Sequence, residues 1–82
     1  MEKEKIVTII DDFLIDELEI EEELNPDAKL KDDLGIESLD FVDIAVVIEK
    51  EFGFKVKNEE MADVKTLQHL YDYIYDYLNK PK

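Results

Sequence analysis

Apolar residues recur at intervals of three and four along most of this 82-residue chain, and this spacing limits the folds open to it. Such spacing places apolar side chains along one face of an α-helix. One segment of this kind runs from about Lys3 to Leu18, and another follows Thr66, which can cap it. The expected buried residues are Ile6, Val7, Ile10, Phe13, Leu14 and Leu18 in the first segment, and Leu67, Leu70, Tyr71, Ile74, Tyr77 and Leu78 in the last.

The middle segment, from Leu39 to Phe52, allows two interpretations. Residues 41–48 are rich in β-branched side chains and could form a strand. The absence of a turn signal before Gly53 favours a helix, with Ser38 as its N-cap and Gly53 as its C-terminal cap. We therefore predict a helix. Its buried stripe consists of Phe41, Ile44, Ala45, Ile48 and Phe52.

The helical periodicity lapses between residues 19 and 37, where Asn25-Pro26 is a turn signal. A short helical turn can follow a cap at Asn58. We expect an all-α four-helix bundle with three longer helices, one short third helix and a long first loop. Residues 1–82 are expected to form a single domain. The apolar residues expected to pin the loop to the core are Leu24, Leu30, Leu34 and Ile36.

The composition excludes several classes of function. The chain has 23 Asp and Glu against 10 Lys and no Arg, a formal net charge of −13. Such a surface repels nucleic acid and anionic membranes and attracts basic protein patches. Without cysteine there is no disulfide, thiolate zinc site or cysteine nucleophile. We expect no metal ligands, no stable membrane insertion and, because the N-terminal MEKEK lacks a signal sequence, a cytoplasmic protein.

Ser38 precedes a helix whose second face is unusual. No nucleophilic triad accompanies this serine, because the single histidine, His69, has no evident partner, so we expect no catalytic residue. Apolar residues alternate with charges on the face opposite the core stripe, which fits a docking site for a basic partner. Alternatively, Val42 and Val46 widen the buried stripe. This second face carries Leu39, Asp40, Val42, Asp43, Val46 and Lys50.

The sequence around Ser38 resembles the prosthetic-group attachment signature of acyl carrier proteins. That signature is Asp-Ser-Leu within Leu-Gly-x-Asp-Ser-Leu, at the start of the second helix of a four-helix bundle. The order and spacing of the predicted elements agree over nearly the whole chain. The matching residues are Leu34-Gly35-Ile36-Glu37-Ser38-Leu39-Asp40, then Val42, Asp43, Ile48, Glu49 and Glu51-Phe52-Gly53.

The resemblance implies a monomeric carrier on which acyl groups travel as thioesters, within fatty acid biosynthesis. Ser38 would receive phosphopantetheine from coenzyme A. The partners would be a phosphopantetheinyl transferase and acyl-processing enzymes with basic docking patches. Their acidic contacts would be Glu37, Asp40, Asp43 and Glu49, and their apolar contacts Leu39, Val42 and Val46. The acyl cavity would be lined by Ile44, Ala45, Ile48, Val56, Met61, Val64, Leu67, Leu70 and Ile74.

Two residues depart from the family pattern. Glu37 replaces the usual aspartate before the serine, and Lys50 stands where many members carry another acid. We expect altered partner preference, since charges at the rim of an interface mainly tune association rate and specificity. Two alternatives stay open: a carrier for amino acid or polyketide units, and an unmodified acidic adaptor in which Ser38 only caps the helix.

Overall fold

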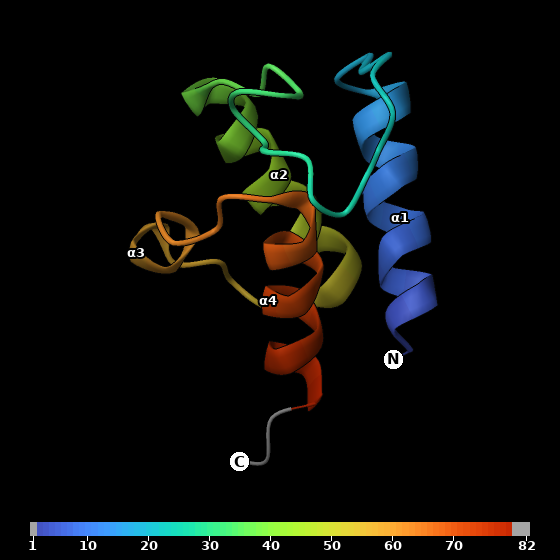
Figure 1. Ribbon diagram of the computed structural model, residues 1–82. Helices are drawn as coiled ribbons and strands as arrows, with labels where there is room; N and C mark the ends of the chain where they lie inside the picture. Colours follow the sequence, from blue (N-terminus) through green and yellow to red (C-terminus); the bar gives the residue numbers. More distant parts are fainter. Residues whose placement is uncertain (1, 80–82) are drawn as a thin grey trace.

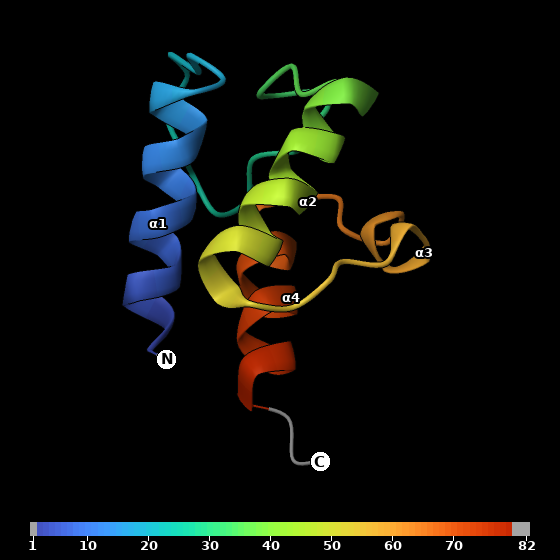
Figure 2. The same cartoon turned by 180° about the vertical axis from the view of Figure 1, so that it is seen from behind.

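A computed structural model describes residues 2–79, which contain four helices. They are α1 (Lys3–Asp16), α2 (Ser38–Phe52), α3 (Asn58–Met61) and α4 (Leu67–Asn79). The helices α1, α2 and α4 form the body of the bundle, and the short α3 lies on the side away from α1 (Figures 1 and 2). The predicted all-α fold with three longer helices, a short third helix and a long first loop is confirmed, and residues 41–48 are helical.

The core is built from one stripe on each long helix. These stripes follow the predicted three-and-four spacing, and their aliphatic side chains have no exposed surface. Burying an aliphatic side chain of this size contributes about 1.5–3 kcal/mol, so this core dominates the stability of the fold. The fully buried residues on the helices are Ile6, Ile10, Leu14, Ile44, Ile48, Leu67, Leu70 and Ile74.

The end of α1 differs from the prediction. The helix ends at Asp16 rather than at about Leu18. Glu19 adopts a positive φ of 53°, and the Ile20 N–H donates to the Leu14 carbonyl over 3.1 Å. This left-handed turn folds the chain back over the end of the helix. Ile20 is therefore buried where the periodicity favoured Leu18, which is only partly buried.

The long first loop is hydrogen-bonded to the start of α4. An isolated antiparallel bridge joins Lys29 to Thr66, and the Leu30 N–H donates to the Lys65 carbonyl over 2.9 Å. The first residue of α4, Leu67, donates its N–H to the Ala28 carbonyl over 3.0 Å. The loop thus satisfies backbone donors that a helix start leaves free. As predicted, apolar loop residues reach the core: Leu30, Leu34 and Ile36 are buried and Leu24 is partly buried.

Two of the predicted caps are confirmed. Gly53 adopts a left-handed φ of 79° and donates its N–H to the Glu49 carbonyl over 3.0 Å, ending α2. Before α4, the Thr66 hydroxyl accepts the His69 N–H over 3.2 Å. The exposed His69 ring also bonds to the segment before the helix, because its Nδ1 accepts the backbone N–H of Lys65 over 3.2 Å. The single histidine therefore supports a helix start.

Tyr77 was predicted to belong to the buried stripe of α4, and this prediction is wrong. Its side chain remains 46 % exposed. Phe54, which follows the end of α2, stacks on the Tyr77 ring with centroids 3.9 Å apart. Tyr77 therefore lies at the edge of the core, while Tyr71, six residues earlier, is buried.

Candidate functional site

Ser38 is the first residue of α2 and does not cap it, so the predicted N-cap is wrong. The cap position belongs to Glu37, whose extended backbone has φ −98° and ψ 172°. The Glu37 N–H donates to the Asp40 carboxylate over 3.0 Å, which fixes the helix start without the serine. The Ser38 side chain is exposed and takes part in none of the side-chain hydrogen bonds found within residues 2–79. Its hydroxyl is free to react.

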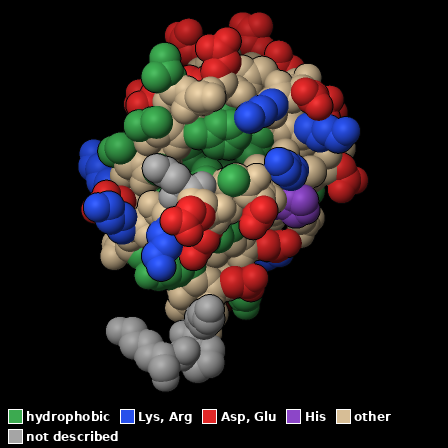
Figure 3. All heavy atoms as spheres, turned by 90° about the vertical axis from the view of Figure 1, so that its left-hand side faces the viewer, with side chains coloured by type: hydrophobic (Ala, Val, Ile, Leu, Met, Phe, Trp, Pro, Cys, Tyr) green, Lys and Arg blue, Asp and Glu red, His purple; other side chains and the backbone are tan. Residues whose placement is uncertain are grey.

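A cavity of about 670 Å³ opens beside Ser38. Figure 3 looks onto this side of the molecule, where hydrophobic side chains form a hollow and lysines lie along one side of it. The cavity lies between α2, α3 and the two loops that lead into α2 and α4. Its lining consists of Lys29, Leu30, Lys31, Asp32, Ser38, Phe41, Val42, Ala45, Met61, Ala62, Val64 and Lys65.

The residues expected to form an acyl cavity lie in three kinds of place. Ala45, Met61 and Val64 line the open cavity next to Ser38. Val56 is half-buried and packs against the core. The others lie deeper, in the closed core without exposed surface: Ile44, Ile48, Leu67, Leu70 and Ile74. The open hollow is thus the outer part of a continuous apolar region.

The residues expected to contact partners lie together on the surface of α2. Leu39, Val42 and Val46 are 78 %, 59 % and 57 % exposed, so the two valines do not widen the buried stripe. Glu37, Asp43 and Glu49 are exposed, and Asp40, which caps the helix, is half-buried. We call Leu39, Val42 and Val46 with these four acids the outward face of α2. Apolar side chains this exposed indicate an interaction surface.

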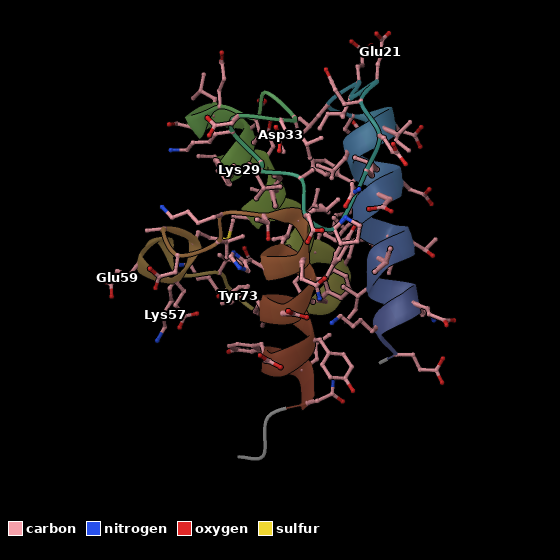
Figure 4. All side chains as sticks on the ribbon, in the orientation of Figure 1. Glu21, Lys29, Asp33, Lys57, Glu59 and Tyr73 are labelled. Carbon is pink, nitrogen blue, oxygen red and sulfur yellow. The ribbon has the colours of Figure 1, made fainter. Side chains whose placement is uncertain are left out.

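The groups with the most perturbed titration lie elsewhere, in one pair that joins α1 to α4 and another that joins α3 to α4. Burial raises the pKa of the Asp11 carboxyl, although the hydrogen bond donated by the Tyr71 hydroxyl partly opposes this. Tyr73, whose hydroxyl donates to Glu60 over 2.6 Å, has its pKa raised to about 12, chiefly by burial (Figure 4). Both pairs hold elements together. Within the described residues, no group of three or more acidic or histidine side chains could hold a metal ion.

Comparison with known proteins identifies the family. A family model described as a phosphopantetheine attachment site matches residues 8–74. An acyl carrier protein of Coprothermobacter proteolyticus is 37 % identical over 75 residues, covering 90 % of this chain and 92 % of that protein. An acyl carrier protein of Petrotoga mobilis is 31 % identical over 80 residues, covering 96 % of this chain and 94 % of that protein. The chain belongs to the acyl carrier protein family.

As an acyl carrier protein, the chain is a carrier rather than an enzyme, and its cofactor is covalently bound phosphopantetheine. Its own residues fit such a group. A covalent arm needs an accessible nucleophilic oxygen and room beside it, and Ser38 offers an exposed hydroxyl at an apolar hollow. From residue 2 to residue 79, no helix is both long and apolar enough to cross a membrane.

The sequence interpretation missed the three lysines of the cavity. Lys29 and Lys31 lie in the first loop and Lys65 directly precedes Thr66, so sequence spacing does not connect them. The bridge between Lys29 and Thr66 brings the two loops together. The only hint in the sequence is that two of them, Lys29 and Lys31, lie shortly before the Ser38 motif.

Proposed function

We propose that Ser38 is the attachment point of phosphopantetheine and that residues 1–82 act as one acyl carrier domain. The observation that carries the proposal is the free, exposed hydroxyl of the first residue of α2, beside an apolar cavity. In the attachment step, the Ser38 oxygen would bond to the phosphorus that carries the pantetheine, and the phosphoanhydride P–O bond of coenzyme A would break. The remaining adenosine bisphosphate would leave with the electron pair, and the Ser38 proton would pass to solvent. Once bound, the group supplies the thiol that holds an acyl group as a thioester.

The outward face of α2 then serves as the docking surface for the transferase and the acyl-processing enzymes. Its exposed acids attract a basic patch over a distance, and Leu39, Val42 and Val46 provide a small apolar contact. A small contact area with charge steering gives fast association and fast release, as a monomeric shuttle between several enzymes needs. The proposal places this exchange in the cytoplasm, where coenzyme A and such enzymes are found.

Attachment is tested by the intact mass of the protein after incubation with coenzyme A, Mg²⁺ and a broad-specificity phosphopantetheinyl transferase. The wild type should gain one phosphopantetheine and the Ser38→Ala variant none. Because Ser38 does not cap α2, we expect this variant to keep its stability within about 0.5 kcal/mol. A folded wild type that gains no mass, or a Ser38→Ala variant that does, would contradict the assignment and favour an acidic adaptor.

Fatty acyl groups fit the structure better than amino acid or polyketide units, because the space beside Ser38 is walled by Phe41, Ala45, Met61 and Val64. An apolar chain that enters this space is removed from water, at about 0.8 kcal/mol per buried methylene group. The melting temperature of the thioester form should therefore rise as the acyl chain lengthens and remain unchanged with a polar aminoacyl group. Equal melting temperatures for all cargoes would argue against a fatty acyl carrier.

A further inference from the structure

The cavity beside Ser38 carries the opposite charge to the rest of the molecule. The chain as a whole has a net charge of −13. Around the cavity, Lys29, Lys31 and Lys65 face a single acid, Asp32. A hollow of similar size between α1 and α2 shows the usual balance, since its five acids, Asp12, Asp16, Glu17, Asp43 and Glu51, face the single cation of Lys50.

The fold brings the three lysines together. The antiparallel bridge between Lys29 and Thr66 places the first loop against the segment before α4. There the backbone carbonyl of Lys65 accepts the Leu30 N–H over 2.9 Å. Asp33 lies beside Lys29, and its carboxylate accepts the backbone N–H of Lys29 over 2.8 Å (Figure 4). Two backbone segments more than thirty residues apart in the sequence therefore supply one basic rim.

None of these three ammonium groups forms an ion pair with a carboxylate of the described residues. Within residues 2–79 the one ion pair joins Lys3 to Asp72, at the other side of the bundle. The Lys31 ammonium group lies 5.9 Å from the centre of the Phe41 ring, which also lines the cavity. Three cations without a carboxylate partner, at the rim of one hollow, suit an occupant with an anionic group.

We propose that Lys29, Lys31 and Lys65 bind the phosphate that phosphopantetheine brings to Ser38 and hold the arm over the cavity. This rests on the proposed attachment at Ser38. The phosphate is joined to the Ser38 oxygen, so it necessarily lies at the mouth of the same cavity that the lysines line. The ion pairs would fix the base of the arm and keep the arm beside the cavity. The thiol is then partly sheltered between visits to partner enzymes.

The test uses the loaded protein without an acyl group, in which the phosphate is the only anion on the arm. The rate at which neutral iodoacetamide alkylates the thiol is compared between the wild type and a variant with Lys29→Gln, Lys31→Gln and Lys65→Gln. Exposed ion pairs are individually weak, so we expect the rate to rise about two- to fivefold in this variant. The ³¹P chemical shift of the phosphodiester should move as well, which loss of packing alone would not cause.

The matched control carries Lys5→Gln, Lys55→Gln and Lys57→Gln, three exposed lysines that do not line the cavity. It has the same net charge as the first variant and should keep the wild-type rate and ³¹P shift. Equal rates and shifts in all three loaded proteins would overturn the lysine assignment and leave attachment at Ser38 intact. A wild type that cannot be loaded would overturn the proposed function, and this inference with it.

Salt provides a second test that needs no variant. Between about 0.01 M and about 1 M salt the Debye length falls from roughly 30 Å to roughly 3 Å. The alkylation rate of the loaded wild type should rise over this range if ion pairs hold the arm. A rate that does not depend on salt would contradict the proposal even if the transferase fails to load the cavity variant.

Discussion

The two faces of α2 carry similar side chains in opposite surroundings. Ile44 and Ile48 have no exposed surface, whereas Val42 and Val46, each two residues earlier and so on the other side of the same helix, are more than half exposed. Packing explains the first pair, because each fills the core between α1 and α4. Val42 lines the cavity beside Ser38 and Val46 lines the hollow between α1 and α2, so neither is packed in the closed core. The comparison shows that one face of α2 builds the fold, whereas we propose that the other contacts a partner.

The largest expected effect is a difference in stability between variants on the two faces of α2. The Ile48→Ala variant should lower the free energy of unfolding by about 2–4 kcal/mol, because it leaves a cavity in the core. The Val46→Ala variant on the outward face should change it by less than about 0.5 kcal/mol. Urea unfolding followed by circular dichroism measures both. Similar losses in the two variants would mean that the outward face is part of the packed structure.

The next effect concerns docking. The Leu39→Ala variant should lower kcat/KM for loading by the transferase about tenfold, as expected for an apolar anchor at an interface. The matched control is Ile15→Ala, which removes an exposed aliphatic side chain from α1. Loading kinetics of the control should stay within about twofold of the wild type. If Ile15→Ala impaired loading as strongly as Leu39→Ala, docking would not be confined to α2.

A smaller effect is expected at the end of α2, where Gly53 has φ 79°. Any other residue is strained in this left-handed conformation, so Gly53→Ala should lower stability by about 1 kcal/mol. This loss of stability would come from backbone strain in the turn and not from a steric clash, because a Cβ at this position meets no atom within 4 Å. Gly53→Asn serves as the control, since asparagine tolerates this conformation better. Equal stability of the glycine and alanine proteins in thermal unfolding would refute the assigned turn.

The smallest effect concerns pH and tests the packing of α1 on α4. Burial raises the pKa of Asp11 in the folded protein, so its stabilising contribution is complete at pH values below its unfolded pKa. That contribution is lost as the pH rises through the raised pKa. Asp11→Asn keeps an acceptor for Tyr71 and does not titrate. The difference in unfolding free energy between wild type and variant should therefore shift against the wild type as pH rises, and a constant difference would contradict the burial of Asp11.

The helices could be predicted from the sequence because their buried stripes are long and regular. Less could be predicted at their ends. Ser38 is a better capping residue than Glu37, yet Glu37 holds the cap position because the Asp40 carboxylate accepts its N–H. At the end of α1, the turn at Glu19 buries Ile20. These outcomes depend on a few local hydrogen bonds that periodicity does not report.

The candidate site was predictable where residues are close in sequence. Ser38 and the outward face of α2 lie within one helix, so helical spacing alone groups them. The basic rim of the cavity depends on the bridge between Lys29 and Thr66, a contact between distant segments. The division of the expected cavity residues into an open hollow and a closed core is likewise a property of the packed bundle.

The most direct test of the two-faced helix is the footprint of a partner enzyme. The amide NMR spectrum of the ¹⁵N-labelled protein would be recorded during titration with the phosphopantetheinyl transferase. We predict shifts that concentrate at Ser38, Leu39, Val42, Val46 and Glu49 and that weaken as salt is added. A footprint confined to α1 and α4, with the outward face of α2 unperturbed, would contradict the account.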